Sequence, residues 1–122
     1  MEKLLTGKPA IVTGAARRIG KAVALKFAEE GANIVMVDIL EDDLKQTKAQ
    51  VVAFRTKVTA IPVDLTKDEQ VYAMVDQVAK EYGTVDILMN NAGISREMPF
   101  HEMPMDTFDK IIEINLRSVA LI

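Results

Sequence analysis

Residues 13–20 read TGAARRIG, and they separate a short apolar run, AIVT at 10–13, from a segment of helical periodicity. Apolar residues recur at helical spacing from Ile19 to Phe27, and Gly31 then provides a helix stop. A glycine between a strand and a helix permits a sharp turn, and it lets backbone N–H groups approach an anion. We therefore expect a strand–turn–helix unit that can hold a phosphate group. The alternative is a turn that needs glycine and binds nothing, because the spacing is not GxGxxG.

The rest of the chain repeats this alternation of strand and helix. Apolar runs predict strands at 34–37, 58–63 and 85–89, and periodic segments predict helices at 41–55, 66–82 and from about 106 onward. Thr66 followed by Glu69 is a capping-box pattern for the start of the third helix. Strands that alternate with helices indicate parallel pairing through right-handed crossovers. We therefore expect an α/β fold, a three-layer doubly wound parallel sheet.

Composition excludes several classes of protein. The 122 residues fit a single domain, 1–122, with a net charge of −3 and no basic block that would favour nucleic acid. There is no cysteine, and His101 is the single histidine, so thiolate and histidine-rich metal sites are excluded and we expect no metal. No apolar run is long enough for a membrane span, and no secretory leader pattern is present, so we expect a cytoplasmic location and no membrane partner.

Asp38 lies at the end of the second predicted strand, 24 residues after Gly14. In a dinucleotide-binding fold, an acidic residue at about this distance accepts hydrogen bonds from the adenosine ribose hydroxyls. Its charge would also repel a 2′-phosphate, which favours NAD over NADP. The alternative is that Asp38 only caps the helix that follows.

Four segments together resemble the short-chain dehydrogenase/reductase family. TGAARRIG resembles its TGxxxGxG turn, Asp64-Leu65 resembles its adenine-contacting pair, and residues 90–93 match its NNAG motif. Asn115 stands where the family carries the asparagine of its catalytic tetrad. The resemblance spans nearly the whole chain and implies a Rossmann-like domain with strand order 3-2-1-4 and a nicotinamide dinucleotide as partner.

The resemblance implies a role for each matching residue. Gly14 and Gly20 would shape the pyrophosphate turn, and Ile19 would lie toward the nicotinamide. Asp38 would hold the ribose and Asp64, with Leu65, the adenine. The backbone of Asn91, Ala92 and Gly93 would line the cofactor, while Asn90 would brace the strands.

The chain departs from the family pattern at Arg18, which replaces the middle glycine of the turn. Its side chain must leave the turn, and together with Arg17 it offers a positive site that suits a 2′-phosphate. The arginines and Asp38 therefore disagree about NADP and NAD. We favour NAD, because an aspartate at the ribose excludes the phosphate at close range, whereas arginines at a helix start can swing away.

Asn115 interrupts the apolar stripe of the last predicted helix, whose other members are Phe108, Ile111, Ile112, Leu116 and Val119. A buried amide needs hydrogen-bond partners, so we expect Asn115 to have a specific role. The resemblance implies a catalytic one, holding a water that connects a catalytic lysine to solvent. The alternative is a structural bond to a neighbouring strand.

The family's chemistry also requires a serine and a YxxxK pair. Neither Tyr72 nor Tyr82 has a lysine four residues later, and Ser95 and Ser118 stand at the wrong places. The resemblance thus implies an NAD(P)-dependent oxidoreductase that transfers hydride between the cofactor and an alcohol or carbonyl substrate, of which this chain carries the cofactor half and is inactive alone. The alternative is a non-catalytic dinucleotide-binding module. A response-regulator receiver is excluded, because Thr13-Gly14 replaces the acidic pair that it needs.

Two uncovered surfaces indicate self-association. With order 3-2-1-4, the strand at 85–89 forms an edge of the sheet, and exposed edges invite pairing with another chain. The apolar face of the last helix also lacks part of its cover. We therefore expect a homo-oligomer or an aggregation-prone chain.

Overall fold

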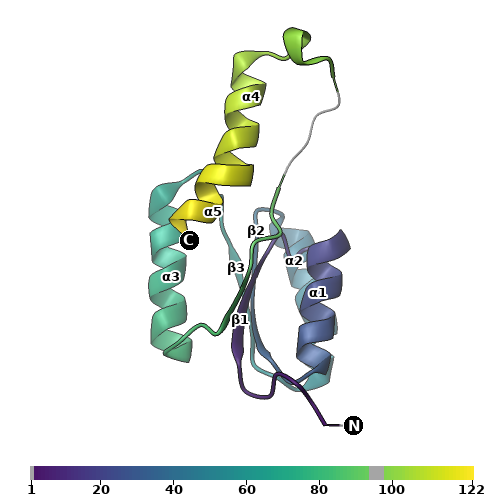
Figure 1. Ribbon diagram of the computed structural model, residues 1–122. Coiled ribbons are helices and arrows are strands. Elements are labelled where there is room, and N and C mark those ends of the chain that lie inside the picture. Colours follow the sequence, from purple (N-terminus) through teal and green to yellow (C-terminus); the bar gives the residue numbers. More distant parts are fainter. Residues whose placement is uncertain (1, 94–97) are drawn as a thin grey trace.

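A computed structural model describes residues 2–93 and 98–122 of the chain (Figure 1). Strands and helices alternate through the first part of the chain, and the last part is helical. The elements are β1 (Pro9–Thr13), α1 (Arg18–Glu29), β2 (Asn33–Asp38), α2 (Glu41–Val51), the 3₁₀ turn η1 (Val52–Phe54), β3 (Val58–Pro62), α3 (Asp68–Tyr82), β4 (Ile87–Met89), the 3₁₀ turn η2 (Phe100–Glu102), α4 (Met105–Ile112), the π-helical turn η3 (Glu113–Arg117) and α5 (Ser118–Leu121).

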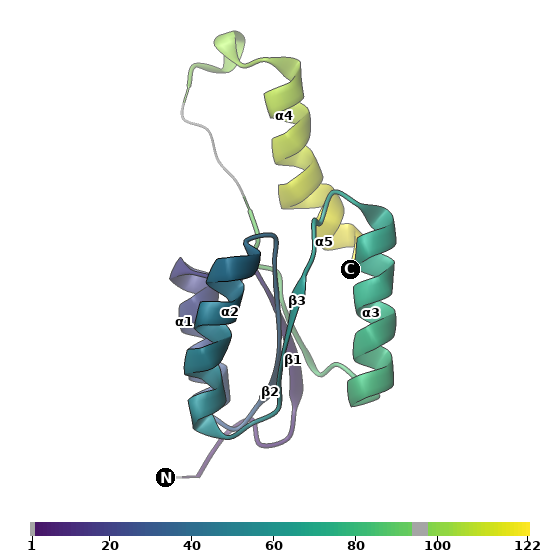
Figure 2. The same ribbon diagram turned by 180° about the vertical axis from the view of Figure 1, so that it is seen from behind.

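The four strands form one parallel sheet in the order β3-β2-β1-β4, which confirms the predicted fold and strand order. The register aligns Val12 with Met36 on one side and with Met89 on the other. Helices α1 and α2 cover one face of the sheet, and α3 covers the opposite face (Figures 1 and 2). The carboxyl ends of all four strands therefore meet at one edge.

The two central strands, β1 and β2, are apolar on both faces because both faces are covered by helices. Every residue of β1 is buried, and so are the four residues at the centre of β2. Alternate side chains divide between two cores. The core under α1 and α2 takes Ala10, Val12, Ile34 and Met36, and the core under α3 takes Ile11, Val35 and Val37.

Two predicted helix ends differ from the structure. The capping box is wrong, because α3 begins at Asp68 and its N-cap residue, Lys67, makes no side-chain cap hydrogen bond. The Thr66 hydroxyl donates instead to the nearby Asp64 carboxylate, which competes for it within the turn. Helix α2 ends at Val51, and η1 then leaves Phe54 37% exposed instead of on an apolar helix face.

The apolar stripe predicted for the last helix is largely uncovered. Three members of the predicted apolar face, Ile112, Leu116 and Val119, are exposed, whereas Ser118 is buried. The π-helical turn η3 lies in the middle of this segment. Figure 1 shows α4 extending beyond the edge of the sheet, with α5 returning beside α3. No helix in the described part of the chain is long and apolar enough to cross a membrane.

Candidate functional site

A cleft of about 400 Å³ opens at the carboxyl edge of the sheet. This is where ligands bind in open α/β sheets, at the point where the strand order reverses between β1 and β4. The loops after all four strands contribute to it. Its lining consists of Gly14, Arg17, Arg18, Ile19, Val37, Asp38, Ile39, Leu40, Val63, Asp64, Leu65, Asn91, Ala92, Gly93 and Ile114.

Two glycines allow the turn after β1 to pack against the segment after β4. Gly14 has a φ of +66°, and a Cβ atom there would lie 2.8 Å from Asn91 Nδ2. A Cβ atom on Gly20 would lie 2.0 Å from the Gly14 carbonyl oxygen, which no adjustment of a side chain can relieve. Gly20 is therefore buried beneath the turn and does not line the cleft, so its part in the site is to let α1 start this close to Gly14.

Thr13 joins the two segments by hydrogen bonds, a role that the sequence pattern did not predict. Its buried hydroxyl accepts hydrogen bonds from the N–H groups of Asn91 and Ala92, each at 3.0 Å, and is 3.4 Å from the Met89 carbonyl, to which it donates. The side chain of Asn91 donates to the Gly14 carbonyl oxygen at 3.2 Å. Its place at the end of a buried strand could have predicted this role, because a buried hydroxyl requires hydrogen-bond partners.

The side chains of Asn90 and Asn91 differ in what they contact. Asn90 is exposed, whereas the Asn91 side chain bridges the two loops. Asn91 therefore contributes its side chain to the architecture of the cleft as well as its backbone to the lining.

Asp38 joins the glycine turn to the end of β2. Its Oδ2 accepts the Ala16 N–H at 3.0 Å, and its Oδ1 accepts the Leu40 N–H at 2.9 Å. The N-cap residue of α2 is Leu40, so Asp38 is not simply the cap of that helix. Each carboxylate oxygen has further acceptor capacity, and Asp38 lines the cleft, so the carboxylate can still accept hydrogen bonds from a ligand.

The glycine turn carries two exposed arginines at the wall of the cleft. Arg18 has a φ of +55°, a left-handed conformation in which a non-glycine residue is uncommon. The backbone thus keeps the conformation suited to glycine, and the exposed side chain has left the turn as predicted. Neither Arg17 nor Arg18 forms an ion pair with any described residue, so both are available to an anionic ligand.

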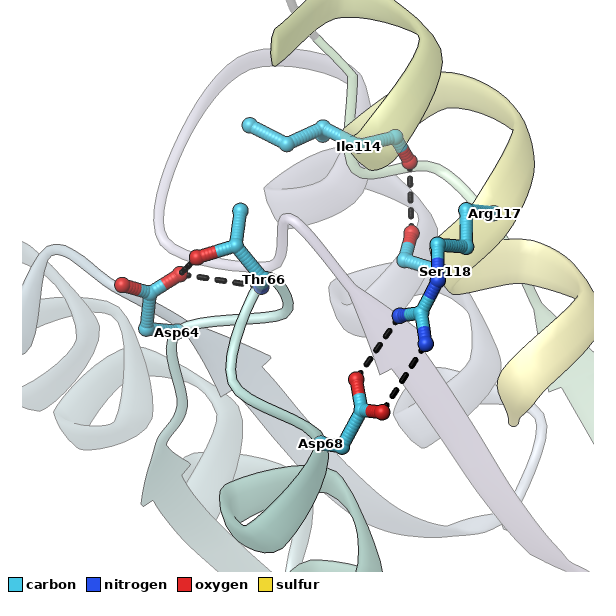
Figure 3. A network of polar contacts seen from close by, with 6 residues as sticks. All are labelled: Asp64, Thr66, Asp68, Ile114, Arg117 and Ser118. Carbon is cyan, nitrogen blue, oxygen red and sulfur yellow. Dashed lines mark hydrogen bonds and ion pairs between the residues drawn. The ribbon is translucent and has the colours of Figure 1, made fainter. Parts of the chain in front are cut away.

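Asp64 and Leu65 form the wall of the cleft after β3. Asp64 Oδ1 accepts hydrogen bonds from the Thr66 hydroxyl at 2.7 Å and from the Thr66 N–H at 3.0 Å (Figure 3). The hydroxyl hydrogen bond is the main reason that the pKa of the Asp64 carboxyl lies below its ordinary value. Asp64 is therefore an ionised acceptor at neutral pH, beside the buried Leu65.

Asn115 is exposed, so the expectation that its amide is buried in an apolar stripe is wrong. The π-helical turn that contains it carries its side chain toward the cleft, and its Oδ1 would lie 3.2 Å from a Cβ atom on Gly93. Gly93 thus leaves room for Asn115 at the mouth of the cleft.

The structure therefore brings ten of the eleven predicted cofactor residues to one cleft, all except Gly20, with Asn115 beside it. Sequence reasoning missed its apolar wall, which consists of Val37, Ile39, Leu40, Val63 and Ile114.

Ser95 lies outside the described residues, and the buried Ser118 hydroxyl donates to the Ile114 carbonyl. No group of three or more residues that could hold a metal ion occurs in residues 2–93 and 98–122.

Comparison with known proteins shows the family of this chain. The sequence model of the short chain dehydrogenase family matches residues 8–122. The chain belongs to the short-chain dehydrogenase family. It is similar to the NAD-dependent glycerol dehydrogenase of Listeria innocua, 42% identical over 96% of this chain and 45% of that protein. It is also similar to the 3-oxoacyl-[acyl-carrier-protein] reductase of Chlamydia muridarum, 40% identical over 98% of this chain and 48% of that protein.

Solved structures of this short-chain dehydrogenase fold agree closely. NAD⁺-bound xylitol dehydrogenase superposes with a TM-score of 0.93 and 34% identity, covering 98% of this chain and 46% of that one. The L-sorbose reductase of Gluconobacter frateurii, complexed with NADPH and L-sorbose, superposes with a TM-score of 0.93 and 32% sequence identity. The match covers 99% of this chain and 46% of that one. The chain thus spans about half the length of the relatives that it matches.

We predict that Thr13→Val weakens the junction between the two loops. Valine has the same shape but leaves the Asn91 and Ala92 N–H groups without the hydroxyl that they share, at a cost of about 1–3 kcal/mol in the free energy of unfolding. Urea denaturation measures this loss, and Thr13→Ser, which keeps the hydroxyl, is the matched control. Equal stability of the valine variant and the unmodified chain would contradict the role of Thr13.

We also predict that Thr66→Val raises the pKa of the Asp64 carboxyl, because the hydroxyl that stabilises its ionised form is lost. The folded-state pKa is below the unfolded value of about 3.9, so this carboxylate stabilises the fold above that pH, and the contribution disappears as the pH falls through the folded-state pKa. NMR titration of the Asp64 carboxyl carbon measures the change, with Thr84→Val as a distant control. A pKa of Asp64 that does not move would refute the assignment.

Proposed function

We propose that this cleft binds NAD and that the chain is the cofactor-binding part of an oxidoreductase. The whole enzyme would transfer hydride between the nicotinamide and an alcohol or carbonyl substrate, which is the chemistry that the cofactor supplies. The fit rests on the glycine positions that a Cβ atom would fill, Gly14 and Gly20, because they let the backbone after β1 come close to a ligand at the start of α1.

The observation that carries the choice of NAD is Asp38 at the rim of the cleft. Its carboxylate is held by the Ala16 and Leu40 N–H groups, so it cannot turn away from the ribose position without breaking both hydrogen bonds. Arg17 and Arg18 are exposed and have no ion-pair partner among the described residues, so they are free to move. A fixed negative charge excludes a 2′-phosphate more effectively than mobile arginines attract one.

The remaining site residues would divide the cofactor between them. Asp64 and Leu65 would hold the adenine, with the ionised Asp64 as acceptor for its amino group. The backbone of Asn91, Ala92 and Gly93 would line the nicotinamide side, toward which Ile19 also lies. Asn115 would stand above this end of the cleft, where it is the one member of the family's catalytic tetrad that we assign in this chain.

A second candidate function is a dinucleotide-binding module without catalysis. In these 122 residues, Asp76 and Asp86 follow Tyr72 and Tyr82 at the fourth position, so neither tyrosine belongs to a YxxxK pair. Without a tyrosine and lysine to transfer the proton, we expect the 122 residues to bind cofactor but not to turn over. Both functions predict that the isolated chain binds the cofactor without turnover. They differ in a longer protein that carries this sequence followed by a serine and a YxxxK pair, and reduction of NAD by an alcohol in that protein would exclude the module.

We predict that calorimetric titration shows saturable NAD binding and weaker NADP binding. Asp38→Asn removes the charge with little change of shape, so we expect NAD to bind about tenfold more weakly or worse and the preference against NADP to shrink. Asp76→Asn, on the exposed side of α3, is the matched control. Tighter binding of NADP than of NAD by the unmodified chain would refute the proposed specificity.

We further propose that the chain forms homo-oligomers through the edge at β4. Val85 and Leu88 are 40% and 39% exposed there, and Leu116 is 63% exposed on the last helix. Light scattering is expected to show a mass above that of one chain, and Leu88→Lys to reduce it. Val52→Lys, at an exposed position after α2, is the control. A monodisperse monomer for the unmodified chain would refute this prediction.

A further inference from the structure

The segment that carries Asn115 is attached to the rest of the molecule near its C-terminal end. None of the residues of α4 is buried, and the α4 helix extends beyond the sheet (Figure 1). Burial begins only at Ser118, and Leu121 and Ile122 pack against the core under α3. The orientation of the whole helical segment therefore depends on a small number of contacts around η3 and α5.

One of these contacts is an ion pair between two helices. Arg117 Nη1 donates to Asp68 Oδ1 at 2.7 Å, and Arg117 Nη2 donates to Asp68 Oδ2 at 2.8 Å, which Figure 3 shows as two parallel hydrogen bonds. This bidentate arrangement fixes direction as well as distance, because both groups are planar. Asp68 is the first residue of α3, where a negative charge is favoured by the helix dipole.

The ion pair is close to both residues that η3 presents to the cleft. Arg117 follows Asn115 by two positions, and Ile114, which lines the cleft, accepts the hydrogen bond of the Ser118 hydroxyl. A π-helical turn is a local departure from the ordinary helix and is frequent at functional sites. Arg117 is the last residue of this turn, and its ion pair with Asp68 joins the turn to α3.

We infer that Arg117 is a positioning residue of the cleft. By holding Asp68 at the start of α3, it fixes the π-helical turn and thereby sets Ile114 and Asn115 at the mouth of the cleft. The identity of the ligand in the cleft rests on the proposed function, whereas the role of Arg117 in placing the turn does not. The placement of the turn can be tested without any cofactor.

The first test is amide hydrogen exchange of residues 113–118 in the free chain. In Arg117→Gln and in Asp68→Asn we expect exchange in this segment to be about two- to fivefold faster, the range that exposed ion pairs provide. The double variant should exchange no faster than either single variant, because one interaction is lost in all three. Arg55→Gln removes an exposed arginine elsewhere and is the matched control.

A purely structural role would change the global stability instead of the local turn. We therefore expect exchange of the β1 and β2 amides, and the urea midpoint, to stay close to those of the unmodified chain. The side-chain amide NMR signal of Asn115 should shift in Arg117→Gln, while that of the distant, exposed Asn90 should not. Arg117→Lys, which keeps the charge but not the bidentate geometry, should give an intermediate result.

Unchanged exchange at 113–118 in Arg117→Gln would overturn the inference, and so would an equal increase over the whole sheet. Titration of the same variants with NAD separates this result from the proposed function. If the unmodified chain binds no NAD, the proposed cofactor site fails, whereas the exchange result still decides the role of Arg117.

Discussion

The close packing of the turn after β1 against the segment after β4 is the constraint on which the rest of the site depends. Gly14 and Gly20 allow the approach, since a side chain at either would collide with a neighbour. The Thr13 hydroxyl then satisfies the N–H groups of Asn91 and Ala92, which would otherwise be left in a partly buried junction. Because β1 is the central strand between β2 and β4, this junction aligns the other loops of the cleft.

Asp38 extends the same junction to the next strand. Its two carboxylate oxygens accept N–H groups from the glycine turn and from the residue that caps α2. The buried Thr47 hydroxyl of α2 in turn donates to the Ala16 carbonyl, so Ala16 is hydrogen-bonded to α2 through its carbonyl and to Asp38 of β2 through its N–H group. A polar network of this kind fixes the charge of Asp38 in place before any ligand arrives, which is the physical basis of a preorganised site.

The far side of the cleft is built differently. Asn115 and Ile114 belong to a helical segment that is mostly exposed and that is joined to α3 by the Arg117–Asp68 ion pair and by the apolar contacts of Leu121 and Ile122. The wall formed by the loops after β1 and β2 is thus continuous with the buried sheet. The wall formed by Ile114 and Asn115 belongs to a helical segment that is attached to the surface of the molecule. Local openings are expected at the second wall at a lower free energy than at the first, since few apolar contacts hold it.

Hydrophobic patterning predicted the fold class, and the resemblance to the short-chain dehydrogenase family implied the strand order and most residues of the cleft. Continuous apolar runs require strands covered on both faces, and polar or glycine residues at the ends of parallel strands must meet at one edge. Only the tertiary structure decided the exposure of Asn115 and the hydrogen-bond partner of Thr66, which the sequence pattern did not predict. Periodicity predicted that Asn115 is buried in an apolar stripe, but that stripe is exposed and the Asn115 side chain lies beside Gly93. A capping pattern assigned Thr66 to the start of α3, but Asp64 took its hydroxyl. Thr13 and the Arg117–Asp68 pair depend on contacts between residues distant in the chain, and no local pattern encodes them.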